Sequence, residues 1–180
     1  MKTHESRLRF GVLFLLAAAQ SVAQDPVKVA GNHYKLIAEN DNLRIIEVTL
    51  AAGAKTVMHS HPSVIAVILD PSVTKWTAPD GKSVQSPPDQ KRGAIISMKP
   101  ETHVSENIGK TGTRAILVEF KKPAPAAGKG SNPSLPAPYK QVDDTPHARV
   151  FECTVAAGGS TPQHTHAREN VLVALTDLTA

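Results

Sequence analysis

The stretch Gly53-Ala-Lys-Thr-Val-Met-His-Ser-His61 places a glycine six residues before a pair of histidines that a single residue separates. Alternate side chains of a β-strand point to the same face, about 7 Å apart along the strand. If His59 and His61 lie in a strand, both imidazoles face the same side, where they can share one cation. A glycine suits the turn that leads into such a strand. The stretch therefore predicts a metal-binding strand.

The sequence around this stretch is typical of an all-β protein. Residues 64–69 form a continuous apolar run, as expected of a strand that is buried on both faces. Gly81 lies in a turn between two short polar segments and predicts a hairpin, because glycine readily takes a positive φ. The predicted strands cover residues 44–50, 64–69, 73–77, 93–98 and 114–120. Many short strands at regular spacing predict a sandwich or barrel.

His103 is the candidate for a third ligand. It follows Pro100-Glu-Thr, which we interpret as a tight turn that enters a new strand. A third imidazole from a neighbouring strand would complete a facial triad and leave coordination positions open for water, substrate or oxygen. We therefore expect His59, His61 and His103 to hold one divalent ion, with Fe(II) or Mn(II) favoured over Zn(II) or Ni(II).

The spacing of these residues resembles the cupin superfamily. The Gly53–His61 stretch matches the first half of cupin motif one, and His103-x3-Asn107 matches the end of motif two. The resemblance is to small domains of the cupin-2 type and covers about residues 33–121. It implies a double-stranded β-helix, also called a jelly-roll barrel, in which the two motif-one histidines and the motif-two histidine are metal ligands.

Two positions depart from the family pattern. The usual motif-one glutamate falls on Ile65 or Ala66, and the Pro-x-Gly of motif two is replaced by residues 99–102. Three neutral imidazoles leave the charge of a divalent ion uncompensated. Such a site is expected to favour an anionic or ionisable ligand, such as a carboxylate, enolate or thiolate.

Part of the first module recurs near the end of the sequence. Residues 149–166 align with residues 44–61 at an offset of 105, and nine of the eighteen positions are identical. We therefore interpret residues 139–180 as an incomplete second cupin-like repeat, with a strand expected at 171–175. The aligned His164 and His166 are weaker candidates for a second metal site, with only Glu169 nearby. Two interpretations stay open, a truncated reading frame and a half-module that adds strands to another barrel.

The remaining segments frame these modules. Residues 1–23 have the order of a secretory signal peptide: basic residues, an apolar run over 10–19, and small residues that end at Ala23. The apolar run is too short to cross a bilayer, so no stable membrane span is expected after cleavage. Localisation is therefore expected to be periplasmic or secreted. The cupin barrel is predicted over 24–121, and residues 122–138, with five prolines, form a predicted linker.

Composition narrows the classes of partner. Removing residues 1–23 takes away three basic residues and one acidic residue, which lowers the net charge from +4 to +2. No basic patch interleaved with aromatics remains, so nucleic acid is not an expected partner, whereas a small molecule is. Cys153 is the only cysteine, which excludes an internal disulfide, and we interpret it as a small buried hydrophobic residue. A homodimer is compatible with this composition.

Three functions fit the sequence. The first is an exported metalloenzyme that acts on a small anionic or enolisable molecule by dioxygenase- or isomerase-type chemistry, as the resemblance implies. The second is a non-catalytic cupin that binds or senses a small ligand or a metal. The third is a structural remnant whose half-module serves oligomer assembly. The sequence identifies no catalytic acid or base, so it does not decide between turnover and binding.

Overall fold

The computed structural model describes residues 24–122, 135, 137–166 and 169–177. The predicted signal peptide and most of the predicted linker lie outside the described residues. The described part of the chain contains one short helix, α1 (Pro26–Val29), and eleven strands. The prediction of an all-β fold is therefore confirmed.

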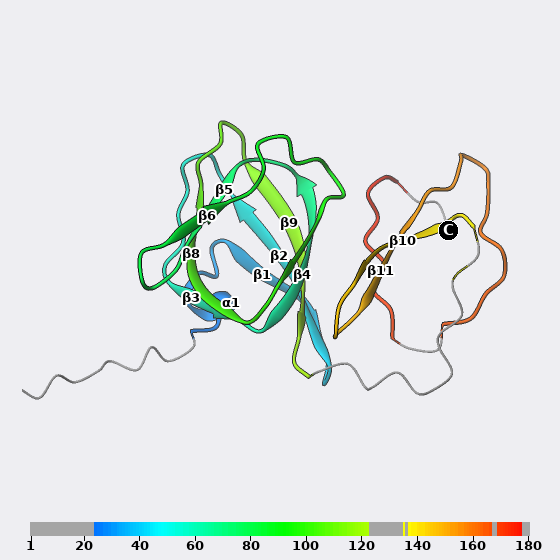
Figure 1. The fold of residues 1–180 in the computed structure, drawn as a ribbon, viewed down its shortest axis with the longest axis horizontal. Coiled ribbons are helices and arrows are strands. Elements are labelled where there is room, and N and C mark those ends of the chain that lie inside the picture. The colour runs from blue at the N-terminus through cyan, green and yellow to red at the C-terminus, as the bar shows by residue number, and fades with distance from the viewer. Residues whose placement is uncertain (1–23, 123–134, 136, 167–168, 178–180) are drawn as a thin grey trace, which may run out of the picture.

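Nine strands form two sheets that face each other and enclose a barrel interior (Figure 1). All of the pairings within these sheets are antiparallel. The five-stranded sheet has the order β1 (Tyr34–Glu39), β2 (Leu43–Leu50), β9 (Thr113–Phe120), β4 (Ser63–Asp70) and β7 (Ile95–Met98). The four-stranded sheet has the order β3 (His59–His61), β8 (Glu101–Asn107), β5 (Thr74–Thr77) and β6 (Ser83–Gln85).

The sequence pattern explains two of these elements in detail. Every residue of β4 from Val64 to Leu69 is buried, as the continuous apolar run predicted. The strand lies between β9 and β7, so both of its edges are hydrogen-bonded. The hairpin β5–β6 turns at Gly81, whose φ of +83° is the conformation that a side chain would disfavour.

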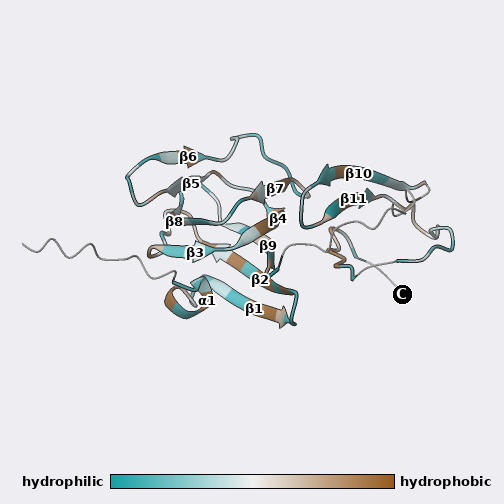
Figure 2. Ribbon diagram, turned by 60° about the horizontal axis from the view of Figure 1, so that its bottom comes forward, coloured by the Kyte–Doolittle hydropathy of each residue, from teal (hydrophilic) through white to brown (hydrophobic). Residues whose placement is uncertain are grey.

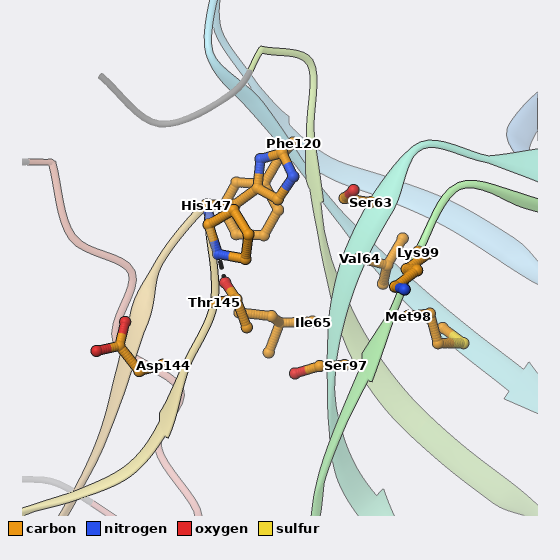
Figure 3. A pocket seen from close by; sticks show the side chains of 11 residues that line it. Ser63, Val64, Ile65, Ser97, Met98, Lys99, Phe120, Asp144, Thr145 and His147 are labelled. Atoms are coloured by element: carbon orange, nitrogen blue, oxygen red, sulfur yellow. Dashed lines mark hydrogen bonds between the residues drawn. The ribbon is translucent and has the colours of Figure 1, made fainter. Parts of the chain in front are cut away.

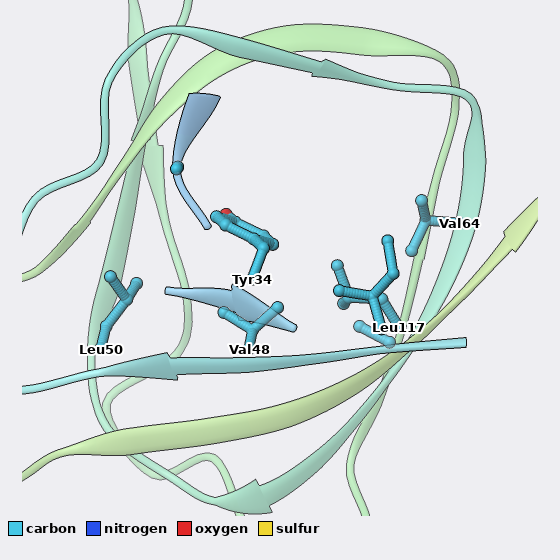
Figure 4. Close-up of a cluster of buried hydrophobic side chains, with 8 residues drawn as sticks. Tyr34, Val48, Leu50, Val64 and Leu117 are labelled. Carbon is cyan, nitrogen blue, oxygen red and sulfur yellow. The ribbon is translucent and has the colours of Figure 1, made fainter. Parts of the chain in front are cut away.

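The hydrophobic core lies against the inner face of the five-stranded sheet. Ile46, Leu50 and Val64 are almost completely buried, and the removal of each such side chain from water contributes about 1.5–3 kcal/mol. Figure 4 shows Tyr34, Val48, Leu50, Val64 and Leu117 gathered in this cluster. In Figure 2, β2 and β4 carry hydrophobic segments, whereas β3 is hydrophilic throughout. The polar strand therefore lies opposite an apolar wall.

The two remaining strands, β10 (Tyr139–Asp144) and β11 (Arg149–Cys153), pair as a hairpin beside the barrel (Figure 1). Ser97 donates a hydrogen bond to Asp143, and the ring of His147 stacks on Phe120 with centroids 5.2 Å apart. A cleft of about 250 Å³ lies between the hairpin and the barrel (Figure 3).

Two predictions for the C-terminal segment are wrong. Residues 171–175 form no strand, because no strand in the described part of the chain pairs with them. Cys153 is exposed rather than buried, because the strand that bears it belongs to a two-stranded sheet with an open face. The described residues also include no helix that is long and apolar enough to span a membrane.

Candidate metal centre

The register between β3 and β8 brings the three predicted histidines together. His59 lies directly opposite His103, and His61 lies opposite Glu101. The ring centroid of His59 is 4.9 Å from that of His61 and 4.8 Å from that of His103. Each of the three residues offers one ligand atom, and these three atoms lie within 4.8 Å of one another. All three side chains are at least 96% buried. The alternation that placed His59 and His61 on one face therefore aims them into the barrel.

Hydrogen bonds fix which nitrogen of His59 and His61 is free. His59 Nδ1 donates to the Val57 carbonyl oxygen at 2.8 Å, and His61 Nδ1 donates to Glu119 Oε1 at 2.6 Å. A carbonyl and a carboxylate only accept, so both protons lie on Nδ1 and both Nε2 atoms keep a lone pair. This is the arrangement in which an outer partner orients a histidine that binds a metal.

His103 has a carboxylate beside it as well. Glu101 Oε1 lies 2.9 Å from His103 Nδ1, but off the direction of the N–H bond, so the contact is mainly one of charge. Contact with His103 also lowers the pKa of Glu101. The carboxylate is therefore ionised at neutral pH and favours the same tautomer at His103.

Glu119 is the centre of a buried charge network that the sequence interpretation missed. Its carboxylate is fully buried and accepts hydrogen bonds from both His61 and Arg44, and Arg44 in turn pairs with Asp25 at 2.9 Å. Residues 113, 115, 117 and 119 of β9 alternate into the interior. A glutamate at an inward position of an apolar strand was the available signal.

These two glutamates change the expected electrostatics of the site. Three imidazole ligands alone leave the charge of a divalent ion uncompensated. Glu119 and Glu101 each place a negative charge one imidazole away from the ligand atoms. The ligand set itself still contains no carboxylate, and the two glutamates offset part of the charge of a divalent ion from outside that set.

Tyr34 is the second residue that the sequence interpretation missed. It begins β1 on the opposite sheet, is 3% exposed, and places its Oη 3.0 Å from His59 Nε2 and 3.3 Å from Ser105 Oγ. Because His59 Nε2 keeps a lone pair, the phenol O–H donates to it. No spacing in the sequence linked Tyr34 to His59.

The arrangement identifies the fold. Two facing antiparallel sheets enclose a His-x-His strand and a third histidine on the strand paired with it, at the positions that the motif resemblance assigned. The chain has a cupin fold.

No family model and no curated protein matches the sequence. Similar solved structures include a cupin domain from Bordetella pertussis, with 21% identity over 49% of this chain and 92% of that one and a TM-score of 0.44. They also include an RmlC-like cupin from Methanocaldococcus jannaschii (16% identity, 48% and 77% covered, TM-score 0.40) and one from Desulfovibrio desulfuricans (19%, 62% and 97%, TM-score 0.38).

The cupin barrel keeps its first histidine in the form that binds metals. Burial, together with the neighbouring His61 and His103, lowers the pKa of His59 to about 4. His59 is therefore a neutral imidazole at physiological pH, and no proton competes with a cation for its Nε2. Burial also raises the pKa of the neighbouring Tyr34 to about 12.

The space beside the histidines is small. A cavity of about 60 Å³ in the cupin barrel is lined by apolar residues of the five-stranded sheet and by Tyr34, His61 and His103. The larger cleft between barrel and hairpin is lined by His147 but by none of the three candidate ligands (Figure 3). Since liquid water occupies about 30 Å³ per molecule, the interior accepts only a small ligand.

The second pair of histidines lies in an open segment outside the cupin barrel. The Nε2 atoms of His164 and His166 are 3.1 Å apart, and Tyr139 Oη is 3.3 Å from that of His164. His166 is exposed, and these residues form no strand, because no described strand pairs with them as β8 pairs with β3. Glu169 contacts Asn40 and Asn42 instead of the histidines.

Proposed function

We propose that the barrel binds one divalent metal ion through His59, His61 and His103 and presents it to a small anionic or enolisable molecule. The observation that carries this proposal is the convergence of three buried imidazoles, each with a hydrogen-bond or charge partner at Nδ1. Imidazole sets of this kind suit Fe(II), Mn(II), Zn(II) and Ni(II). Fe(II) or Mn(II) is favoured for the dioxygenase- or isomerase-type chemistry that the cupin resemblance implies.

The protein would orient the reactants, and a bound divalent ion would supply Lewis acidity and open coordination positions. Glu119 holds the His61 ring in place, and Arg44 holds Glu119. The apolar wall formed by Val48, Leu117 and their neighbours limits the water around the ligand. The neutral imidazoles favour a ligand that brings its own negative charge.

Metal analysis tests the binding proposal. Protein purified without a histidine tag is expected to contain about one divalent ion per chain, or to take one up in equilibrium dialysis. The His103→Ala variant should lose this ion. The matched control is His33→Ala, because the His33 ring contacts the Thr49 carbonyl outside the barrel interior. Equal uptake by the wild type and His103→Ala would overturn the proposal.

A non-catalytic binding or sensing cupin is the alternative. The small, largely apolar cavity supports it, since the ionisable residues lining that cavity are Tyr34 and the two histidines His61 and His103. Oxygen consumption with Fe(II) and a panel of small carboxylates and diketones separates the two functions. Uptake of metal and ligand without oxygen consumption or isomerisation would favour binding.

Export is part of the proposal and is supported by the signal-like residues 1–23. The first described segment also packs on the barrel, where the Ser60 amide donates to the Gln24 carbonyl at 2.8 Å. Cell fractionation and mass spectrometry of the full-length product test it. A mature protein that begins near Gln24 outside the cytoplasm is expected, whereas an uncleaved cytoplasmic product would contradict it.

We also propose that residues 139–166 are a partial copy of the first module and bind a second cation weakly through His164 and His166. The two hairpins β1–β2 and β10–β11 share the same register and the same bulge, which supports the copy. Tyr139 pairs with Cys153 as Tyr34 pairs with Val48, and both residues of the second hairpin lie 105 positions after their counterparts in the first. Gly158 has a φ of +75°, and its counterpart Gly53 has +74°.

The second site has its own test. In the double variant His164→Ala/His166→Ala, any second, weaker binding event seen in a calorimetric Zn(II) titration should disappear. The tight event at the first site should remain unchanged. A second event that survives this substitution would show that another group binds the cation.

A further inference from the structure

We propose that Tyr34 Oη is a fourth protein ligand of the metal ion at His59, His61 and His103. This inference rests on the proposed metal site and deepens it. It gives the centre an oxygen donor from β1, a strand that contributes nothing to the motif from which the site was predicted.

The hydroxyl of Tyr34 lies close to the predicted metal-binding nitrogen of His59. Tyr34 Oη lies 3.0 Å from His59 Nε2, the atom whose lone pair is free for a cation. Two donor atoms that each lie about 2.1 Å from one ion, at a right angle, are separated by about 3.0 Å. The hydrogen-bond spacing of these two atoms therefore also fits two neighbouring ligands of one ion in octahedral geometry.

The Tyr34 hydroxyl loses its main hydrogen-bond partner when a cation takes the lone pair of His59 Nε2. The hydrogen bond from Tyr34 to His59 then breaks, and Ser105 Oγ at 3.3 Å is the hydrogen-bond partner of Oη that remains. The residue is 3% exposed, so few other partners lie within reach of the phenol oxygen. An oxygen lone pair beside a divalent ion in a buried site is stabilised by coordination, and the phenol proton passes to solvent as the bond forms.

The three histidines include no negatively charged ligand. The family glutamate is absent from the positions of Ile65 and Ala66, and the three imidazoles are neutral ligands. Glu119 contacts His61 and Glu101 contacts His103, each at Nδ1, so neither carboxylate lies on the Nε2 side of its imidazole. A tyrosine oxygen in direct contact supplies the anionic donor that the histidine set lacks.

The pair recurs within the chain. Tyr139 and His164 have the same separation of 25 residues in the sequence as Tyr34 and His59. Their ring centroids are 5.0 Å apart, against 4.9 Å for the first pair, and the hydroxyl contacts Nε2 in both. Residues 139–166 thus repeat the tyrosine together with the two histidines, as expected if the three act on one ion.

Visible spectroscopy of the iron-loaded full chain tests the inference, because the chain has only two tyrosines. The protein is loaded with Fe(II) without oxygen, oxidised to Fe(III) with one equivalent of ferricyanide and desalted. A tyrosine oxygen bound to Fe(III) gives a visible charge-transfer band that imidazole ligands do not give. Wild type and Tyr139→Phe should show the band, and Tyr34→Phe should lose it while still retaining iron.

Zinc affinity gives a second readout with a definite sign. Tyr34→Phe should raise the Zn(II) dissociation constant at least about tenfold, and Tyr139→Phe should leave the tight site unchanged. An unaltered or stronger affinity in Tyr34→Phe would mean that the hydroxyl only competes for the His59 lone pair, and would overturn the inference. So would a band that persists in Tyr34→Phe or is absent from iron-loaded wild type. Failure of the wild type to bind any metal would instead overturn the proposed function.

Discussion

His61 and Glu119 are joined across the barrel: Nδ1 of the histidine lies 2.6 Å from Oε1 of the glutamate, and the two residues come from strands of opposite sheets. Both side chains are almost completely buried, and Arg44 completes the pair on its outer side. A candidate metal ligand is thus tied to the opposite wall by a charged hydrogen bond, which is stronger than a neutral one.

Glu119→Gln tests this relationship. We expect the affinity for Zn(II) to fall about 10- to 100-fold, because the amide orients His61 less strongly. The free energy of unfolding should fall by about 3 kcal/mol, since Arg44 loses its buried ionised partner. Isothermal calorimetry and urea denaturation measure the two effects. Glu106→Gln is the control, because Glu106 bonds Lys75 on the outside of the barrel and should leave the affinity unchanged.

Asp25→Ala removes the outer end of the same network. Asp25 pairs with Arg44 and accepts a hydrogen bond from the Val27 amide at the start of α1. We expect a loss of about 1 kcal/mol in stability and a much smaller change in metal affinity than in Glu119→Gln, because Glu119 keeps its bond to Arg44. The exposed Asp41→Ala is the matched control. An affinity loss as large as that of Glu119→Gln would contradict this order.

Asn107 is expected to act on stability alone. Its buried amide donates to the carbonyl oxygens of Leu50 and Thr111, and its Oδ1 accepts from Gly109 N and Ser72 Oγ. Asn107→Ala should cost about 3 kcal/mol, because it removes several buried hydrogen bonds at once. Ser72→Ala should cost clearly less. Thermal denaturation measures both, and a specific loss of metal affinity in a folded Asn107→Ala protein would refute this assignment.

Stability in EDTA should depend on pH through His59. The pKa of His59 is about 4 in the folded protein, against an ordinary value of 6.5 in the unfolded chain. Between these values the unfolded chain binds the extra proton, so stability is full above pH 6.5 and falls as the pH decreases towards 4. The slope from this residue approaches about 1.4 kcal/mol per pH unit.

Urea midpoints between pH 8 and pH 4.5 measure this dependence. The variant His59→Gln should show a shallower slope over the same range, because the titrating group is gone. An identical slope in the variant would assign the effect to other residues.

Local sequence sufficed for most strands of the barrel and for the choice of candidate ligands. The unbroken apolar run of β4 and the glycine turn of β5–β6 follow from side-chain chemistry and backbone freedom over a few residues. The single-residue gap in His59-x-His61 dictates a shared face, because strand alternation has a period of two. The same local reasoning failed at residues 171–175, where a strand also requires a partner to pair with.

The sequence by itself determined an all-β fold and a shared face for His59 and His61, because alternation and turn chemistry are local properties. The barrel and the ligand role of His103 were predicted from the motif resemblance. Only the tertiary structure decided what surrounds those rings. Tyr34 and Glu119 lie 25 and 58 residues from the histidines they contact, on the opposite sheet. Their approach depends on how two sheets pack face to face, and no pattern within one strand encodes that distance.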